Sequence, residues 1–274
     1  MPGTSLGPKH PPVKQPAAAR RQLARTVKLA AVCDVLYLDL TCASPEANLA
    51  CDEALLDVCD AAEDGPGVLR LWEPSQHFVV VGYGGRVAQE VNLAACTSCG
   101  IPVLRRCSGG GTVLQGPGCL NYSLVLPVRA DPCLASIAQT NQFVLERHRQ
   151  VLSHLLAKSV ALQSQTDLAI DSLKCSGNAQ RRRSRAVLVH GTFLLGLDLD
   201  LMEAVLPLPA RQPAYRQGRQ HREFLTQLPL SAHVLKAALR QAWAAERPLE
   251  QVPWQAIDAL VQRRYSQPAW TFRF

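Results

Sequence analysis

Apolar positions recur with two different spacings along the chain, and the two spacings predict helices and strands in alternation. Ser44 followed by Pro45 and Glu46 predicts the start of a helix, in which apolar residues continue at helical spacing to Val58. A longer apolar stripe predicts a second helix over about 135–158. Further helices are predicted at 92–99, 231–246 and 253–265, and strands at 35–40, 68–72, 78–82, 102–105, 120–126, 166–173 and 186–197.

The order of these elements predicts the fold class. We expect the strand at 68–72 to pair with the strand at 78–82. We also expect 166–173 to pair with 186–197, as a hairpin around the polar stretch 176–185. Because strands come mostly in neighbouring runs with few crossovers, the pattern favours an α+β fold with helices packed on a mixed sheet over a doubly wound Rossmann arrangement.

Composition and charge narrow the class of protein. With 19% charged and 47% hydrophobic residues, the 274-residue chain can bury a core. It holds no run of about 18 uncharged apolar residues, so no membrane-spanning helix is expected. Of the net charge of +7, six positive charges lie before Asp34, in a Pro/Ala/Arg-rich stretch over 1–34 that we interpret as a disordered tail. The remainder is nearly neutral, which argues against nucleic acid as a partner.

The cysteine pattern points to a reduced protein. The ten cysteines are scattered among apolar residues, without the short, loop-rich setting of a disulfide framework. A cytoplasmic location is therefore expected. Cys96 and Cys99 have C-x-x-C spacing, but without a second pair or a nearby histidine they would make half of a zinc site, and two packed thiols are the simpler interpretation.

A glycine-rich segment directly follows the strand that ends at Arg105. Gly109, Gly110 and Gly111 lose much backbone entropy on ordering, so a folded protein keeps such a run where backbone approaches a ligand or takes a positive φ. Their amides can cradle an anion, and Arg105 and Arg106 supply charge for a phosphate or a carboxylate. A tight turn between strands is the alternative. The segment matches neither a Walker loop nor a G-x-G-x-x-G fingerprint.

Two later segments also place polar residues where packing does not require them. Lys174 ends an apolar strand beside Ser176 and Gly177, where an ammonium could stabilise charge growing on a carbonyl or phosphoryl oxygen. A surface lysine whose stem covers apolar neighbours is the alternative. Gly191, next to His190 inside a strand, indicates close approach of a ligand, although a histidine satisfied within the core is the ordinary explanation of such a residue.

Taken together and in this order, the segments resemble the lipoate protein ligases. The resemblance rests on Glu46–Leu56, Arg105–Val113 (Arg-Arg-Cys-Ser-Gly-Gly-Gly-Thr-Val), Gly118–Ser123, Asp167–Leu168, Lys174–Gln180 (Lys-Cys-Ser-Gly-Asn-Ala-Gln), His190–Thr192 and Tyr265–Trp270. It extends from about residue 35 to the C-terminus. It favours the ligand-binding interpretation of the glycine run, of Lys174 and of His190.

The resemblance implies a fold and a reaction. That family shares its catalytic fold with the biotin protein ligases and the octanoyl transferases, which implies a mixed, mostly antiparallel sheet with helices packed on it and a tunnel for an acyl chain. Biotin ligases carry Gly-Arg-Gly-Arg where this chain has the Arg105–Gly111 run, so lipoate or octanoate is the implied acid. ATP, with Mg²⁺, would convert lipoate to lipoyl-AMP, and a lysine amine of a lipoyl domain would then displace AMP.

The resemblance also implies a set of site residues. Lys174 would neutralise charge at the mixed anhydride through both steps. Asp167 would align Mg²⁺ or the adenylate. The residues implied to bind the acyl head group, the phosphates or the nucleotide are Arg105, Arg106, Ser108, Gly109, Gly110, Gly111, Thr112, Asn121, Ser176, Gly177, Asn178, Ala179 and Gln180, with His190, Gly191 and Thr192 lining the pocket.

Partners and domains follow from the same resemblance. The implied acceptors are lipoyl domains of 2-oxoacid dehydrogenase complexes or the H protein of glycine cleavage. Many ligases append an accessory domain for which this chain has no residues left, so a single catalytic domain over 35–274 is expected, with a separate accessory subunit as a further partner. The chain departs from the family at Gln115, where many members have histidine.

Three other functions stay open. An octanoyl transferase would take its acyl group from acyl carrier protein onto a cysteine thiolate. Residues 134–174 hold no cysteine where the most similar cysteine-dependent branch keeps its nucleophile, although Cys107, Cys119, Cys133 and Cys175 are chemically able to serve. A noncatalytic acyl-binding protein would not need Lys174. An RNA-binding module would use the arginines of 181–185, which are more simply a solvated turn.

Overall fold

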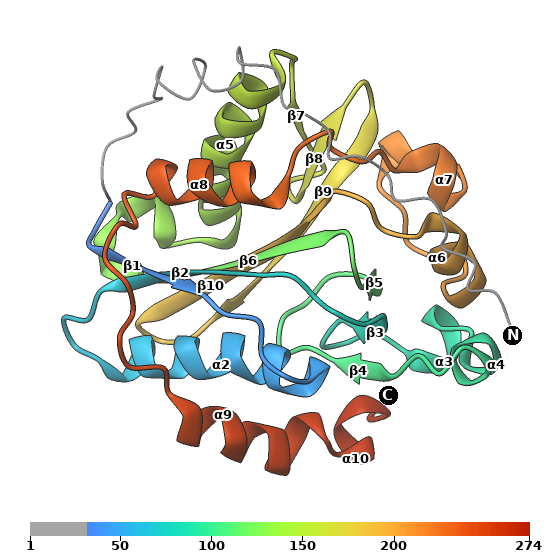
Figure 1. Ribbon diagram of the computed structural model, residues 1–274, viewed down its shortest axis with the longest axis horizontal. Helices are drawn as coiled ribbons and strands as arrows, with labels where there is room; N and C mark the ends of the chain where they lie inside the picture. Colours follow the sequence, from blue (N-terminus) through green and yellow to red (C-terminus); the bar gives the residue numbers. More distant parts are fainter. Residues whose placement is uncertain (1–31) are drawn as a thin grey trace, which may run out of the picture.

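The computed structural model describes residues 32–274, so the tail expected over 1–34 lies almost entirely outside the described residues (Figure 1). Its centre is a seven-stranded sheet with the strand order β1-β2-β6-β10-β9-β8-β7. These strands are β1 (Val35–Asp39), β2 (Gly67–Trp72), β6 (Cys119–Pro127), β7 (Ala161–Gln163), β8 (Asp167–Ile170), β9 (Leu173–Arg182) and β10 (Ala186–Leu194). β1 is parallel to β2, and the other neighbouring strands are antiparallel.

A three-stranded sheet with the order β4-β3-β5 stands beside the large one. It consists of β3 (Phe78–Val81), β4 (Val103–Arg105) and β5 (Val113–Gln115), with β3 parallel to β4 and antiparallel to β5. The expected pairing of 68–72 with 78–82 is therefore wrong. β2 bonds to β1 on one edge and to β6 on the other, so it has no free edge for β3.

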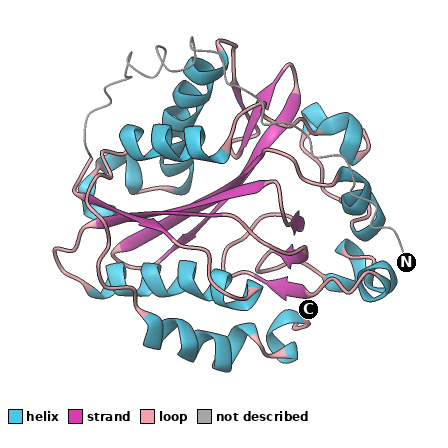
Figure 2. Ribbon diagram, viewed as in Figure 1, coloured by secondary structure: helices cyan, strands magenta, loops and turns pink. Residues whose placement is uncertain are grey.

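Helices cover both faces of the large sheet (Figure 2). α5 (Ile137–Leu156) and α8 (Ala232–Ala242) lie on one face, and α2 (Pro45–Ala61) lies on the other, with α9 (Trp254–Leu260) packed on α2 (Figure 1). The remaining helical segments are α3 (Val87–Glu90), α4 (Leu93–Ser98), α6 (Leu199–Val205), α7 (His221–Phe224), α10 (Pro268–Thr271), the 3₁₀ turns Val128–Ala130, Pro132–Leu134 and Ala214–Arg216, and the π-helical turn Val261–Tyr265. The mixed, mostly antiparallel α+β architecture confirms the expected fold class.

β9 corrects a second expectation. It lies between β8 and β10, so 166–173 and 186–197 are not partners, and the turn occupies only 183–185. The polar stretch was expected to be loop, but most of it is strand. Some of its polar side chains have partners on the α5 side: Gln180 Nε2 donates to Asn141 Oδ1 of α5 at 2.6 Å, and Asn178 Oδ1 accepts the Tyr122 hydroxyl at 2.8 Å.

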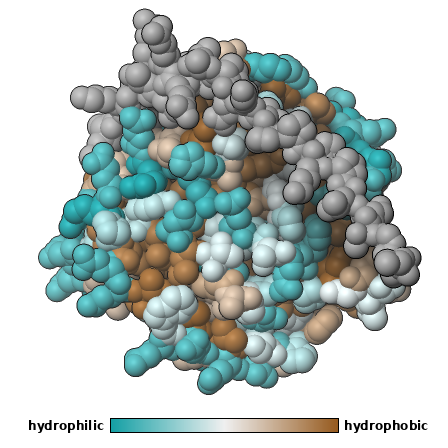
Figure 3. Space-filling view, viewed as in Figure 1, coloured by the Kyte–Doolittle hydropathy of each residue, from teal (hydrophilic) through white to brown (hydrophobic). Residues whose placement is uncertain are grey.

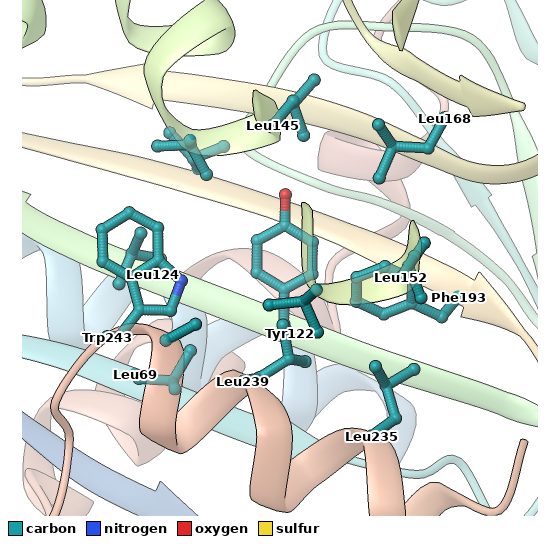
Figure 4. Packing of buried hydrophobic residues seen from close by; sticks show 14 of the residues in the cluster. Leu69, Tyr122, Leu124, Leu145, Leu152, Leu168, Phe193, Leu235, Leu239 and Trp243 are labelled. Carbon is teal, nitrogen blue, oxygen red and sulfur yellow. The ribbon is translucent and has the colours of Figure 1, made fainter. Parts of the chain in front are cut away.

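Apolar clusters fill both sides of the large sheet. One cluster joins alternate residues of β2, β6 and β10 to α5 and α8, as Tyr122, Phe193 and Trp243 illustrate in Figure 4. The second joins the opposite residues of the same strands to α2 and α9. The N-terminus of α2 is capped as expected, because Ser44 Oγ accepts the Ala47 amide at 3.1 Å.

On the side of the sheet that carries α2, called the α2 face below, polar residues replace apolar ones toward the three-stranded sheet. Residues directly opposite each other on neighbouring strands share a face. Register therefore gives two rows across the α2 face: Arg70, Ser123, His190 and Ala179, then Trp72, Asn121, Thr192 and Gly177. These two rows form the floor of the candidate site.

The described surface is mixed. In the space-filling view, hydrophilic side chains occupy much of the outline, and apolar ones gather near the middle of this face, between α2 and α8 (Figure 3). No helix among residues 32–274 is long and apolar enough to cross a membrane.

Candidate active site

Gly109–Gly111, called the glycine turn below, are held at the surface of the site by Arg106, which binds two of their three carbonyls. The Arg106 guanidinium is buried and donates to Gly109 O at 2.6 Å and to Gly111 O at 2.8 Å, both through Nη2. The three glycines themselves are exposed. Their amides donate no hydrogen bond to any group within residues 32–274. Successive free N–H groups of this kind form a concavity suited to an anion.

The fold requires glycine at only one of the three positions. Gly110 has a φ of +88°, and a Cβ there would lie 2.8 Å from Arg106 Nη2, so the protein itself needs glycine. At Gly109 and Gly111, φ lies outside the left-handed region, and a Cβ would meet no atom within 4 Å. Nothing in the described chain demands glycine at these two positions.

The ammonium of Lys174 lies over the same face of β9 as the glycine turn. A Cβ on Gly177 would lie 2.9 Å from Lys174 Nζ, and a Cβ on Gly110 would lie 3.6 Å from Ala179 Cβ. Gly177 and Ala179 are two residues apart in an extended strand, so their positions differ by roughly 7 Å along it. The Lys174 side chain is only 26% exposed, so it does not point into bulk water.

Asp167 positions that ammonium. Its Oδ1 lies 2.9 Å from Lys174 Nζ, and its Oδ2 accepts the Tyr215 hydroxyl at 2.8 Å. Burial and the neighbouring Asp167 charge raise the pKa of Tyr215, so its phenol stays a donor. No group of three His, Cys, Asp or Glu side chains within residues 32–274 could hold a metal ion. Since both Asp167 oxygens already have partners in the chain, the residues present do not fit a resident metal.

Three amide and hydroxyl side chains close a hydrogen-bonded ring in the second row. Gln115 Nε2 donates to Thr192 Oγ1 at 2.7 Å, Thr192 Oγ1 donates to Asn121 Oδ1 at 2.5 Å, and Asn121 Nδ2 donates to Gln115 Oε1 at 2.9 Å. Gln115 thus has a structural role at the position where many members of the resembled family have histidine.

His190 stands in the first row between a carboxylate and a hydroxyl. Its Nδ1 lies 3.0 Å from Asp52 Oδ2, and its Nε2 lies 2.6 Å from Ser108 Oγ. Asp52 is bound in turn by Arg70 Nη1 at 2.6 Å. Burial acts to raise the pKa of Asp52, but Arg70 and His190 together outweigh it and leave that pKa lowered.

Sequence reasoning did not assign Asp52 and Arg70 to the site. A signal for both was present. Arg70 interrupts an otherwise apolar strand, and Asp52 follows Asn48 by one helical turn on the buried side of α2. A charged residue at a position that the hydrophobic periodicity predicts to be buried needs a partner of opposite charge. Asp52 and Arg70 are such partners for each other.

Several expected site residues point elsewhere. The Arg105 guanidinium is fully buried and donates to backbone carbonyls of the C-terminal segment, such as Thr271, and of the Gly82–Gly85 turn. Thr112 donates to Glu90 at 2.6 Å at the edge of the glycine turn. Ser176, Asn178, Gln180 and Gly191 alternate onto the opposite face of the sheet, where α5 packs.

The thiols near the site are poor nucleophiles. Burial raises the pKa of Cys107, Cys119 and Cys175 to about 12 each. Cys133 lies in the 3₁₀ turn Pro132–Leu134, before α5, which packs on the face of the large sheet opposite α2. A hydrogen bond from Cys51 and the charge of Arg70 lower the pKa of Cys42 to about 7, but this thiol is buried behind Arg70. All ten cysteines are free, as their sequence pattern predicted.

Comparison with known protein sequences finds a family model and several relatives. The family model of the lipoyl protein ligase A/B catalytic domain matches residues 44–232. A protein of Aeropyrum pernix named "Putative lipoate-protein ligase A" is 32% identical, over 79% of this chain and 77% of its own. Octanoyltransferase LipM of Brevibacillus brevis is 25% identical, over 86% of this chain and 98% of its own. Lipoate–protein ligase 1 of Staphylococcus aureus is 28% identical, over 83% of this chain and 70% of its own.

Solved structures show the same fold. A crystal structure of lipoate-protein ligase A bound with ATP superposes with a TM-score of 0.75 at 23% identity, covering 87% of this chain and 98% of that chain. The bi-partite lipoate protein ligase of Thermoplasma acidophilum gives a TM-score of 0.72 at 22% identity, covering 87% of this chain and 96% of that chain.

Proposed function

Because this chain belongs to the lipoyl protein ligase A/B catalytic-domain family, we propose that it is an ATP-dependent lipoate protein ligase. The family contains lipoate ligases and octanoyl transferases, so the chain is an enzyme of acyl activation or acyl transfer. The proposal concerns which of these reactions it performs. Lipoate, or octanoate, is the acid that it would activate.

The reaction must overcome the poor leaving group of a carboxylate. In the proposed first step, a carboxylate oxygen of lipoate attacks the α-phosphorus of ATP, the new O–P bond forms, and pyrophosphate leaves. In the second step, the neutral amine of an acceptor lysine attacks the acyl carbon, the C–N bond forms, the C–O bond to AMP breaks, and one proton is released. Charge develops on phosphoryl and acyl oxygens in both steps, so fixed positive groups would accelerate both.

The chain offers these groups on one face. The free amides of the glycine turn would hold phosphate oxygens, and the Lys174 ammonium, two strand positions away, would neutralise charge where the acyl and phosphoryl groups meet. Asp167 orients that ammonium. Mg²⁺ would arrive with the nucleotide phosphates, which commonly bind it through few protein ligands.

One observation carries the proposal. A side chain at Gly109 or Gly111 would meet no atom of the described chain, and the amides of both residues have no partner within residues 32–274. A backbone anion site of this kind suits the polyphosphate of ATP. A thioester-using transferase has no such polyphosphate to bind.

Octanoyl transfer from acyl carrier protein is the second candidate, because the LipM relatives align over nearly their whole length. That reaction needs an accessible thiolate. Burial raises the pKa of Cys107 and Cys175, the thiols adjacent to the glycine turn and to Lys174, to about 12. This favours the ligase over a cysteine-dependent transferase.

The proposed acceptors are lipoyl domains of 2-oxoacid dehydrogenase complexes and the H protein of glycine cleavage. A separate accessory subunit is a further proposed partner, supported by the bi-partite ligase among the structural neighbours. Free thiols throughout fit the cytoplasm as the compartment that we propose.

The test is modification of a lipoyl domain followed by intact mass. With ATP, Mg²⁺ and lipoate, we expect the domain to gain one lipoyl group, and no gain when ATP is left out. If octanoyl acyl carrier protein alone modifies the domain without ATP, the transferase replaces the ligase, and alanine substitution of each cysteine then identifies the nucleophile. Absence of any modification, with an H protein tested as well, would favour a noncatalytic acyl-binding protein.

A further inference from the structure

We propose that Asp52, His190 and Ser108 are positioning residues that fix the glycine turn through Arg106. This inference rests on the proposed function, since it assigns the turn to the binding of ATP. Four side chains from three parts of the fold form one unbroken line of contacts, from Asp52 in α2 through His190 in β10 to Ser108 and Arg106 between β4 and β5. None of them is a candidate for bond making; they act on the backbone that touches the ligand.

The first link has a fixed charge. Arg70 is fully buried, and besides Asp52 its guanidinium donates to Asn48 O at 2.8 Å and to Leu40 O at 3.1 Å. Arginine stays a cation in proteins, so the Asp52 carboxylate beside it stays ionised and can only accept hydrogen bonds. His190 must therefore present Nδ1–H to Asp52.

The second link follows from burial. Ser108 is fully buried, so its hydroxyl proton needs an acceptor within the protein. Arg106 Nε, 3.0 Å from Ser108 Oγ, can only donate. The Nε2 atom of His190, 2.6 Å away, is the partner that can accept. His190 is accordingly a neutral imidazole with its proton on Nδ1, and Ser108 donates to Nε2.

The last link sets the backbone. With its proton committed to His190, Ser108 Oγ turns a lone pair to Arg106 Nε. The same guanidinium then reaches Gly109 O and Gly111 O through Nη2. A trans peptide points its C=O and the following N–H in opposite directions, so holding Gly109 O toward Arg106 turns the Gly110 amide away from it. The hydrogen bonds of Ser108 thereby help to set the direction of an amide in the anion cradle. Each contact of this line is a hydrogen bond between polar side chains or from a side chain to the backbone of the turn.

The first experiment determines the tautomer of His190 by ¹⁵N NMR of histidine-labelled protein at neutral pH. The His190 signals are assigned by their loss in His190→Gln. We expect protonated Nδ1 and unprotonated Nε2. Protonated Nε2, whether in the other tautomer or in an imidazolium, would overturn the inference. The measurement needs no substrate, so it stands apart from any failure of the ligase reaction.

The second experiment compares Ser108→Ala with Ser123→Ala. Ser123 is an equally buried serine directly opposite His190 in the neighbouring strand; its hydroxyl helps to lower the pKa of Asp52 but makes no hydrogen bond to Ser108 or Arg106 within residues 32–274. We expect Ser108→Ala to move the amide resonance of Gly111, which is not a sequence neighbour of Ser108, and to weaken ATP binding by roughly 3- to 10-fold, the effect of one hydrogen bond. Ser123→Ala should do neither.

The outcomes separate the two claims. An unchanged Gly111 amide resonance in Ser108→Ala would overturn the positioning role, whether or not nucleotide binding changes. Wild-type protein that binds no ATP, but whose glycine resonances still move in Ser108→Ala, would overturn the proposed function and leave the positioning role intact. Both variants should unfold cooperatively, as thermal denaturation verifies before either comparison.

Discussion

Two different factors account for the glycines of the turn: the fold of the protein at Gly110 and the proposed ligand at Gly109 and Gly111. At Gly110 the protein dictates glycine, because φ is positive and Arg106 leaves no room for a Cβ. At Gly109 and Gly111 the space above the backbone is open within the described chain. A methyl group there would enter the volume that a bound anion needs and would leave the protein itself undisturbed.

Alanine substitution should therefore separate stability from activity within one turn. Gly109→Ala and Gly111→Ala should leave the free energy of unfolding unchanged or raise it by up to about 1 kcal/mol, because the unfolded chain loses freedom. ATP-dependent lipoylation should fall at least about ten-fold, the effect of roughly 1.4 kcal/mol. Gly110→Ala should instead lower stability, by about 1–2 kcal/mol for the positive φ alone. Urea denaturation and the lipoyl-domain assay check both effects. Full activity in Gly109→Ala and Gly111→Ala would contradict the role given to the turn.

Lys174 is expected to contribute to catalysis through the positive charge of its ammonium rather than through the packing of its side chain. Lys174→Gln keeps most of the side-chain length but removes the charge next to Asp167. We expect kcat to fall about 100-fold or more, with little change in the KM for ATP, since the charge that it neutralises grows during reaction. Lys158→Gln, at an exposed lysine, is the matched control. A rise in KM at constant kcat would assign Lys174 to ground-state binding.

At the scale of elements, local patterns predicted most helices and strands, but not how strands pair. The cap at Ser44 and the stripe of α5 depend on neighbouring residues, and both are present in the structure. Pairing depends on which edges are free, which no local pattern contains. β9 shows the limit most clearly, because its polar residues acquire partners only once α5 packs against them.

The attachment of α2 to the sheet depends on an ion pair whose strength varies with pH. The pKa of Asp52 is lowered in the folded protein, so its carboxylate stabilises the fold above the unfolded-state pKa of about 3.9, and that contribution is lost as pH falls below it. At neutral pH, Asp52→Asn should cost about 3–5 kcal/mol, because Arg70 stays buried without its counter-ion. The difference between wild type and variant should shrink toward pH 3. Urea denaturation across pH 3–7 measures it, and a difference independent of pH would contradict the ionised pair.

At the scale of the whole molecule, the site is assembled from contiguous runs and from scattered residues. The runs Arg105–Val113 and Lys174–Gln180 could be identified from the sequence because their residues are consecutive. Asp52 and Arg70 lie far from either run and belong to the site only through α2 and β2, so their roles required the fold. For the same reason, Arg105 and Arg106 look equivalent in the sequence, although Arg105 binds the C-terminal segment and Arg106 the glycine turn.

The two activities of the family differ in whether the enzyme makes an acyl-adenylate, and the exchange of radiolabelled pyrophosphate into ATP detects that step alone. We predict exchange that requires both this protein and lipoate, that persists without any lipoyl domain, and that is lost in Gly109→Ala while Lys158→Gln retains it. The account would be contradicted by a folded protein that shows no lipoate-dependent exchange but transfers an octanoyl group from an octanoyl thioester to a lipoyl domain.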